Sequence, residues 1–418
     1  MARPERQRFH VYRVGGSVRD ELLGRDHGDR DWVVVGATPE IMTASGYKPV
    51  GSDFPVFLHP DTREEYALAR TERKHGRGYR GFEFFASPEV TLEEDLARRD
   101  LTINAMARDE NGTLIDPHGG ADDLRAGILR HVSPAFVEDP LRVLRVARFA
   151  ARFGFKVAPE TQRLMRKIVA SGELETLAPE RVWQEVARGL GEEHPARMIA
   201  VLRACGALSR LLPEIDALFG ARAAHVRAGH LDAGRHLERA LEWAASRNRS
   251  LPVRYAVLVH DFASDPDQSS VRPRVARVDG LSARLKVPID CRDAARLVAR
   301  WRADVDRIDG LTPASIVDLL HGTDALRRPD RLSTLLAASE AIACSIAPRA
   351  MTYSSADLLR AALQVVLNVD AGAIAHGVKN GAPTRVHHDD KIAGAIRTAR
   401  IDAIRQWKEA RTRAVDRP

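Results

Sequence analysis

The chain has 418 residues, of which 44% are hydrophobic and 29% are charged. These proportions are typical of folded globular proteins and exclude a collagenous or disordered chain. Lys and Arg number 64 against 57 Asp and Glu, a formal net charge of +7. This balance permits a polyanionic partner such as nucleic acid but does not require one.

Cysteine usage and hydropathy restrict where the protein works. Cys205, Cys291 and Cys344 are widely spaced and form no C-x-x-C pair, so neither a disulfide framework nor a zinc ribbon is predicted. A reducing cytoplasm fits this pattern. The basic N-terminus lacks an apolar signal segment, and no run of roughly eighteen apolar residues is present, so we expect no membrane anchor.

Strand and helix signals occupy different parts of the chain. Between Phe9 and about Ala107, runs rich in β-branched and aromatic residues predict strands at 9–14, 31–36, 55–60 and 64–71. From about Asp139 onward, helical periodicity continues to the C-terminus with breaks at Pro and Gly. The sequence therefore predicts the α+β class, with a small mixed head before an all-α neck and body. The expected divisions are 1–135 (head), 136–200 (neck), 201–330 (helical domain) and 331–418 (helical tail).

Two aspartates stand one residue apart at the start of an apolar strand. In the segment GDRDWVVVG, Asp29 and Asp31 precede or begin the predicted strand. Side chains two apart on a strand point to the same face, so the two carboxylates can share Mg²⁺ ions. A pair of such ions supports in-line attack on an α-phosphate. A lone D-x-D also occurs as a solvated turn, so its context decides the interpretation.

The preceding segment VGGSVRDELLG supplies that context. Gly15 and Gly16 would let the backbone approach a triphosphate, and Arg19 lies one turn into the predicted helix. A guanidinium there can reach phosphate oxygens. Together with the two aspartates, these residues predict a nucleotidyl-transfer site.

A third motif, RRDLTINAMA at 98–107, places charged residues before an apolar run that we predict to be helical. Locally, Asp100 could serve only as an N-cap beside a basic residue. Alternatively, Asp100 and Asn104, four apart on one helix face, could provide the polar groups that a ribose 2′-hydroxyl requires.

The motif EDPLRVLRVAR at 138–148 predicts a helix with arginines at i, i+3 and i+6. One interpretation makes Asp139 an N-cap and the arginines a solvent face. The other uses hydrogen-bond chemistry: Asp139 only accepts and Arg142 only donates. That pair complements the amine and ring nitrogen of cytosine or adenine, whereas uracil and guanine present a carbonyl to the carboxylate.

The order of these motifs resembles the CCA-adding enzymes, tRNA nucleotidyltransferases of the bacterial and eukaryotic class within the DNA polymerase β superfamily. The resemblance covers GGSVRDELLG and DRD, RRDLTINAMA, DPHGGADDLRAGILRHV at 116–132, EDPLRVLRVARFAARFGF at 138–155 and PERVWQEV at 179–186. It implies a polymerase β-like head that adds C, C and A to the 3′ end of tRNA from CTP and ATP, with Mg²⁺. The 116–132 and 179–186 segments are expected to be structural.

The resemblance also implies roles for individual residues. Asp29 and Asp31 would hold Mg²⁺, and a third carboxylate would be Glu65, although the adjacent Glu64 leaves that choice open. The remaining residues would contact the nucleotide. They are Gly16, Arg19 and Arg99 for phosphates, Asp100 and Asn104 for ribose, Asp139 and Arg142 for the base, and Arg145 and Arg148 toward phosphates.

A second set of residues resembles the HD-type metal phosphohydrolase domain that is fused to some of these enzymes. His236 in GRHLERAL and His260-Asp261 in LVHDFASD match its first ligands. The later histidines of that pattern are missing between 262 and 304. We therefore expect an eroded metal site, in a helical domain held by apolar packing.

Three alternatives stay open at this point. A bacterial poly(A) polymerase shares the head motifs, although the short terminal segment ARTRAVDRP favours CCA addition. A non-catalytic RNA-binding protein or an HD hydrolase fits the motifs less well. The expected partners are the acceptor arm and 3′ end of tRNA, with ATP and CTP as substrates. We expect no membrane partner and either a monomer or a homodimer.

Overall fold

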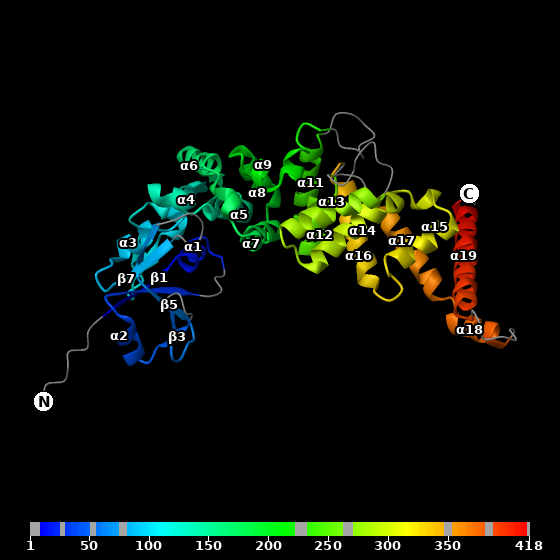
Figure 1. Ribbon diagram of the computed structural model, residues 1–418, viewed down its shortest axis with the longest axis horizontal. Helices are drawn as coiled ribbons and strands as arrows, with labels where there is room; N and C mark the ends of the chain where they lie inside the picture. Colours follow the sequence, from blue (N-terminus) through cyan, green and yellow to red (C-terminus); the bar gives the residue numbers. More distant parts are fainter. Residues whose placement is uncertain are drawn as a thin grey trace. The chain divides into compact units, whose positions relative to one another are not determined.

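The computed structural model describes residues 9–25, 30–50, 56–74, 82–221, 232–261, 271–346, 353–380 and 388–415. The chain divides into two compact units, Met1–Asp216 and Ala217–Pro418 (Figure 1). The boundaries expected after residues 135, 200 and 330 fall inside helical elements that begin at Pro134, Pro195 and Pro329. The four-part division stays a prediction.

The first half of unit 1 alternates short strands and helices. Its strands are β1 (His10–Val14), β2 (Asp31–Val35), β3 (Lys48–Val50), β4 (Val56–Leu58), β5 (Glu65–Leu68), β6 (Arg70–Lys74), β7 (Phe82–Ala86), β8 (Ala107–Arg108), β9 (Leu114–Ile115) and β10 (Ile128–Leu129). Its helices are α1 (Gly16–Leu22), α2 (Pro39–Ala44), α3 (Leu92–Ala97), the 3₁₀ turn η2 (Thr102–Asn104) and α4 (Gly120–Ala126).

One sheet organises this half, in the order β3-β4-β5-β2-β1-β8-β9. The central strands β2 and β5 run parallel, while β1 pairs antiparallel with β2. Both faces of β2 are covered, because Val33 packs in a cluster with Leu92 and Leu96 of α3, and Val34 packs in another with Met42 of α2. A strand buried on both faces accounts for the continuous apolar run of its sequence.

The four predicted strand regions are confirmed, but the helix predicted over 101–107 is wrong. Only Thr102–Asn104 forms a 3₁₀ turn, and Ala107 already pairs with Val14 of β1. Thr102 and Ile103 are β-branched and weak helix formers, so sheet pairing prevails over the local pattern.

Helices make up nearly all of the remainder of unit 1 (Figure 1). They are the 3₁₀ turn η3 (Pro134–Glu138), α5 (Leu141–Phe153), α6 (Pro159–Ala170), η4 (Glu173–Thr176), α7 (Pro179–Gly191), α8 (Pro195–Ala204), α9 (Ala207–Leu211) and α10 (Pro213–Asp216), with the short strand β11 (Lys156–Val157) after α5. Helix α5 packs on α7 and α8 and buries Val143, Val146 and Ala150. This packing fixes the helix that carries the arginine motif.

The described elements of unit 2 are all helical. They are α11 (Ala233–Ser246), α12 (Leu251–Leu258), α13 (Val271–Arg284), α14 (Ile289–Asp306), η5 (Ile308–Gly310), α15 (Pro313–Gly322), α16 (Pro329–Cys344), α17 (Ser354–Leu367), α18 (Ala371–Asn380) and α19 (His388–Val415). Helix α16 packs on α11, α12 and α14, so the predicted helical domain and tail share a core.

One stretch of the described residues, Ser354–Lys379, is long and apolar enough to cross a membrane, with a mean hydropathy of 1.4. It consists of α17 and most of α18, which are separated by Asn368–Asp370. Leu359 and Leu363 are buried, and α17 packs against α14, α15 and α19. We interpret this stretch as part of the helical body.

Candidate active site

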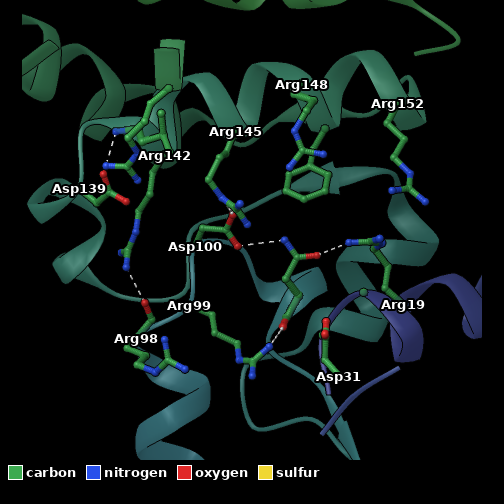
Figure 2. A pocket seen from close by; sticks show the side chains of 16 residues that line it. Arg19, Asp31, Arg98, Arg99, Asp100, Asp139, Arg142, Arg145, Arg148 and Arg152 are labelled. Carbon is green, nitrogen blue, oxygen red and sulfur yellow. Dashed lines mark hydrogen bonds and ion pairs between the residues drawn. The ribbon is translucent and has the colours of Figure 1, made fainter. Parts of the chain in front are cut away.

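A cavity of about 490 Å³ in unit 1 brings most of the predicted site residues together (Figure 2). Its wall contains far more arginines than aspartates. The lining residues are Gly15, Gly16, Arg19, Asp31, Arg98, Arg99, Asp100, Asn104, Asp139, Leu141, Arg142, Arg145, Arg148, Phe149, Arg152 and Arg181. A cavity with this charge suits a polyanionic ligand.

Sheet register sets the acidic side of the site. Asp31 is the partner of Glu65 in the parallel β2–β5 pair, and both residues are exposed. Side chains of directly paired residues share one face of the sheet. Asp31 lines the cavity, while Glu65 is not among its lining residues, and Asp29 lies outside the described residues.

Glu64 belongs to the opposite face. Its Oε2 accepts hydrogen bonds from Trp32 Nε1 at 3.1 Å and from Thr62 Oγ1 at 3.2 Å. Trp32 in turn stacks on Tyr66, with ring centroids 5.4 Å apart. The register therefore favours Glu65 over Glu64 as the companion of Asp31.

Gly15 explains the close approach of an arginine to the backbone. This residue has φ +68°, and a Cβ atom there would lie 2.8 Å from Arg99 Nη1. Arg99 Nη1 donates to the carbonyl of Asn104 at 3.4 Å. An L-residue at position 15 would be strained and would displace the guanidinium.

A chain of hydrogen bonds crosses the floor of the cavity (Figure 2). Arg19 Nη1 donates to Asn104 Oδ1, and Asn104 Nδ2 donates to Asp100 Oδ1 at 2.9 Å. Asp100 Oδ2 accepts from Arg145 Nε at 2.7 Å. The chain connects α1 to α5 through η2, so Asp100 and Asn104 meet as predicted although no regular helix joins them.

Asp100 is held as a carboxylate. Burial by itself would raise its pKa, but the charge of Arg145 and the hydrogen bond from Asn104 lower the pKa of Asp100 to about 2. In return, the charge of Asp100 raises the pKa of Arg145. Burial lowers the pKa of Arg19, and Asp20 partly offsets that effect. These groups form a fixed charge pattern at neutral pH.

The arginines of α5 are not a solvent face. Arg142 and Arg148 are 7% and 8% exposed, which rejects that interpretation. Arg142 donates to the carbonyls of Ala135 at 3.1 Å and Arg98 at 2.6 Å, leaving other N–H groups of its fork for a ligand. Asp139 Oδ1 accepts from the backbone N–H of Leu141, so this residue also has the capping role that its sequence allows.

Several residues that line the cavity were not predicted as site residues, although the sequence carries a signal for them. Arg152 follows Arg148 by one helical turn and extends the same arginine row. Phe149 lies between them in sequence, with its ring centroid 4.4 Å from Arg148 Cζ. Arg181 belongs to PERVWQEV, which was interpreted as structural, yet it lines the cavity.

Two buried carboxylates stand behind the wall, and of these only Asp95, three and four positions before Arg98 and Arg99, had a spacing signal. Asp95 is fully buried and accepts from Arg98 Nη2 at 2.7 Å and from Arg99 Nη2 at 3.1 Å. Glu185 of α7 is 4% exposed and accepts from Arg148 Nε at 2.6 Å. Each one orients a guanidinium that lines the cavity.

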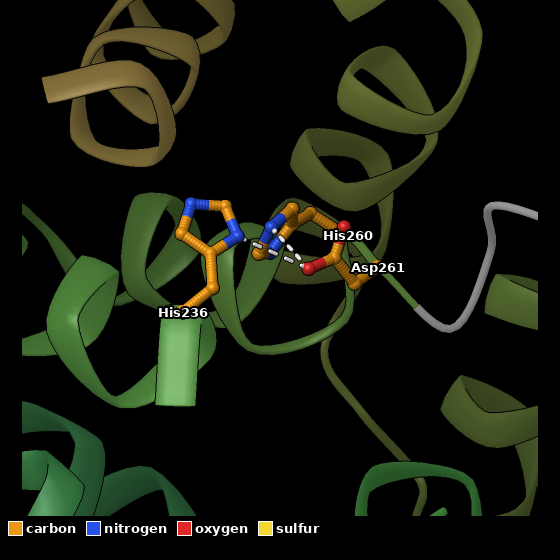
Figure 3. Close-up of side chains that lie close together, drawn as sticks. All are labelled: His236, His260 and Asp261. Atoms are coloured by element: carbon orange, nitrogen blue, oxygen red, sulfur yellow. Dashed lines mark hydrogen bonds and ion pairs between the residues drawn. The ribbon is translucent and has the colours of Figure 1, made fainter. Parts of the chain in front are cut away.

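A separate cluster in unit 2 joins the residues of the HD-type motif (Figure 3). His236, His260 and Asp261 are buried and can each offer one ligand atom within 4.8 Å of the others. Asp261 Oδ2 lies 3.2 Å from His236 Nδ1 and 3.2 Å from His260 Nε2. The other ring nitrogens face backbone carbonyls, His236 Nε2 that of Ile342 at 2.9 Å and His260 Nδ1 that of Val257 at 2.6 Å.

Two family models match the chain. The model described as "Poly A polymerase head domain" matches residues 11–130, which contain Asp31 and the Asp100–Asn104 pair. The model described as "Probable RNA and SrmB- binding site of polymerase A" matches residues 154–219.

Full-length relatives decide the family. The multifunctional CCA protein of Nitrosomonas europaea is 54% identical over 407 residues, which cover 94% of this chain and 98% of the relative. That of Nitrosomonas eutropha is 56% identical over 413 residues, with the same coverage. The chain belongs to the multifunctional CCA proteins. The predicted family resemblance and the α+β head with a helical body are therefore confirmed for this chain.

Solved structures share the fold. The Bacillus stearothermophilus CCA-adding enzyme in complex with CTP matches with a TM-score of 0.64 and 26% identity, over 98% of this chain and 94% of that one. The Thermotoga maritima CCA-adding enzyme complexed with tRNA(CCA) matches with a TM-score of 0.61 and 22% identity, over 95% and 90%. The fold of this chain is thus that of the CCA-adding enzymes.

Proposed function

We propose that this protein adds C, C and A to the 3′ end of tRNA, using CTP and ATP and releasing pyrophosphate. One observation carries the proposal. The arginine row of α5, the hydrogen-bonded chain from Arg19 to Arg145 and the carboxylate of Asp31 line a single cavity. The multifunctional CCA relatives support the same activity over the full chain.

The proposed roles divide the cavity between phosphate, sugar and base. Gly16, Arg19 and Arg99 would bind the triphosphate, with Arg145 and Arg148 toward it. Arginine donors in fixed orientation stabilise the charge that develops during phosphoryl transfer. Asp100 and Asn104 would face the ribose, where an acceptor and an amide can hydrogen-bond a 2′-hydroxyl.

Base choice would come from Asp139 and Arg142. A carboxylate that accepts from an exocyclic amine, next to a guanidinium that donates to a ring nitrogen, complements both cytosine and adenine. A carbonyl at the amine position would leave a buried acceptor facing another acceptor. Protein side chains would then replace a nucleic acid template.

Mg²⁺ is the metal that this chemistry calls for, and the residues present suit it. Asp31 and Glu65 are register partners on adjacent strands, and Mg²⁺ prefers carboxylate oxygens. Asp29, Asp31 and Glu65 would hold it. When bound, such ions favour the deprotonated attacking hydroxyl and neutralise charge on the pyrophosphate leaving group. The arginines orient the triphosphate for in-line attack.

The proposed RNA partner is the acceptor arm of tRNA, bound mainly through phosphates and shape. The protein would work in the cytoplasm as a monomer or homodimer. A poly(A) polymerase shares the head, and the family model of that head matches here too. The full-length similarity to multifunctional CCA proteins favours CCA addition.

A single assay tests the proposal. The protein is incubated with tRNA that ends at the discriminator base, and CTP, ATP, UTP and GTP are offered separately and together. We expect addition limited to C, C and A when CTP and ATP are both present. An A-only tail would move the protein to the poly(A) polymerases, and no extension by any nucleotide would reject the proposal.

For the cluster of His236, His260 and Asp261, we propose an eroded metal site with a structural role. It ties α11 and the end of α12 to α16 through the carbonyl of Ile342. A metal analysis of the purified protein and a phosphodiesterase assay test this. Stoichiometric metal together with hydrolysis would overturn it.

A further inference from the structure

Two arginines of the cavity come from different helices but share one buried carboxylate. Arg19 Nε of α1 donates to Asp20 Oδ1 at 2.9 Å, and Arg152 Nη2 of α5 donates to Asp20 Oδ2 at 2.9 Å. Asp20 is only 7% exposed, so little water competes with the two guanidiniums for its carboxylate. Both carboxylate oxygens therefore hold a guanidinium that lines the cavity.

Aromatic rings of α5 restrict the same guanidinium groups. Arg19 Cζ lies 5.3 Å from the ring centroid of Phe149 and 5.0 Å from that of Phe153. Arg152 Cζ lies 5.1 Å from the centroid of Phe153. Cation–π contacts of this kind limit the rotation of a guanidinium without using its N–H donors. Arg152 keeps N–H groups that Asp20 does not use, because a guanidinium carries five.

The position of Arg152 on α5 indicates which part of the nucleotide it meets. Of the proposed base contacts, Asp139 directly precedes the N-cap of α5 and Arg142 stands in its first turn. Arg152 stands at its last turn, on the same side of the cavity as the proposed phosphate ligand Arg19 (Figure 2). Asp20 joins the two guanidiniums. We infer that Arg152 is a further phosphate contact of the nucleotide and that Asp20 is the positioning residue that holds Arg19 and Arg152 as one clamp. This inference rests on the proposed nucleotide site.

The clamp has a predictable selectivity. Asp20 is placed to act on the phosphate end and not on the base, so its loss should weaken CTP and ATP equally. The two fixed guanidiniums also avoid an ordering cost when the triphosphate binds. The effect should therefore appear in nucleotide affinity more than in turnover.

The next residue on the same helix provides a matched control. Glu21 also stands between two arginines, pairing with Arg13 and with Arg108 Nε at 2.9 Å. Neither Glu21 nor these partners line the cavity. Glu21→Gln thus removes a similar charge from α1 without touching the clamp.

The experiment uses the full chain and compares Asp20→Asn, Arg152→Ala, the double variant and Glu21→Gln. Equilibrium binding of CTP and ATP is measured first, and KM and kcat on tRNA lacking CCA are measured next. We expect each single clamp variant to weaken both nucleotides by about 10-fold, as for loss of one charge-assisted contact. The double variant should fall short of the product of the two effects, because the residues act together. Glu21→Gln should bind both nucleotides like the parent.

Several results would overturn the clamp. If Asp20→Asn is folded and binds both nucleotides like the parent, or if it changes the preference between C and A, the inference is wrong. If Asp20→Asn does not fold, Arg152→Ala decides, and parental affinity in that variant rejects the clamp. If the parent binds CTP but extends no tRNA, the proposed function is wrong. The nucleotide affinities of the variants then still test the clamp.

Discussion

The arginine cavity of unit 1 and the His236–His260–Asp261 cluster of unit 2 both gather buried ionisable groups from several helices. In the cavity, guanidinium groups are oriented from behind by carboxylates and keep N–H groups toward a space of about 490 Å³. In the cluster, each ring nitrogen of the two histidines faces an acceptor within the protein. We therefore expect the cavity, whose donors are directed at open space, to be the working site, and the cluster to be structural.

The pKa shifts of the buried carboxylates do not distinguish the cavity from the cluster. Burial would raise the pKa of Asp261, but His260 and His236 lower it overall, as Arg145 does for Asp100. Both carboxylates are ionised for the same reason. Four predictions test whether the cavity and the cluster differ in function as their geometry indicates.

The largest effect should follow from changing the acidic side of the cavity. We expect Asp31→Asn to slow CTP addition to truncated tRNA by at least ~10³-fold, because a carboxylate that we propose to hold Mg²⁺ is lost. Glu65→Gln should also slow it, whereas Glu64→Gln should not, since Glu64 lies on the other face with Trp32. Rapid-quench measurements of single-turnover rates make the comparison. Equal effects from Glu64→Gln and Glu65→Gln would contradict the assignment by register.

The ionic core of the cavity should show in acid unfolding. The folded-state pKa of Asp100 is about 2, below its ordinary value of 3.8. Its stabilising contribution is therefore present above pH 4 and is lost as pH falls toward 2. The shift corresponds to about 2 kcal/mol. Denaturant unfolding of the parent and Asp100→Asn should differ by about that amount at pH 7 and converge only as the pH falls to about 2. A difference in stability between the two proteins that persists at low pH would show that it does not come from the ionised Asp100. Asp122→Asn, at an exposed position, is the control variant.

A smaller effect should appear at the base end. We expect Asp139→Ala to raise misincorporation of UTP relative to CTP by about 10-fold while most of the turnover is kept, because one discriminating acceptor is lost. Competition assays with mixed nucleotides measure the ratio. Unchanged selectivity between C, A and the other bases would reject the side-chain template.

The smallest effect on tRNA extension should come from the histidine cluster. His236→Gln should lower the free energy of unfolding by about 1 to 3 kcal/mol, because it disturbs a buried hydrogen-bond pair. Extension of truncated tRNA should stay at the parental rate at temperatures where the variant is folded. Thermal melts and extension assays on one preparation test both expectations. Loss of extension by the folded variant would show that the two regions are not functionally separate.

Much of the fold and of the cavity could be predicted from local patterns. The strands near 31–36 and 64–71 and the arginine spacing on α5 are periodic signals, and periodicity fixes which side chains share a face. The helix expected over 101–107 failed because Ala107 pairs with Val14, far away in sequence. Asp100 and Asn104 still meet, since a 3₁₀ turn also brings such residues together.

The distant carboxylate partners of the α5 arginines could not be predicted in the same way. Asp20 and Arg152 are 132 positions apart, and Arg148 and Glu185 are 37 apart. No spacing rule links an acid to a base across such separations, because the contacts of α5 with Asp20 of α1 and with α7 form only in the folded chain. A row of arginines on one helix face can be found in a sequence, but the carboxylates that orient those arginines can be identified only from the tertiary structure.

The parallel pairing of β2 with β5 has a further consequence. Glu64 and Glu65 are chemically identical neighbours, yet only one of them comes to lie beside Asp31. The burial of Tyr66 and Leu68 on the opposite face of the sheet fixes the orientation of β5 and so decides which glutamate lies beside Asp31. Sliding the strand by one step would remove these two hydrophobic side chains from their cluster and exchange the two glutamates. Hydrophobic residues with no part in the proposed chemistry thus select which glutamate lies beside Asp31, the carboxylate proposed to hold Mg²⁺.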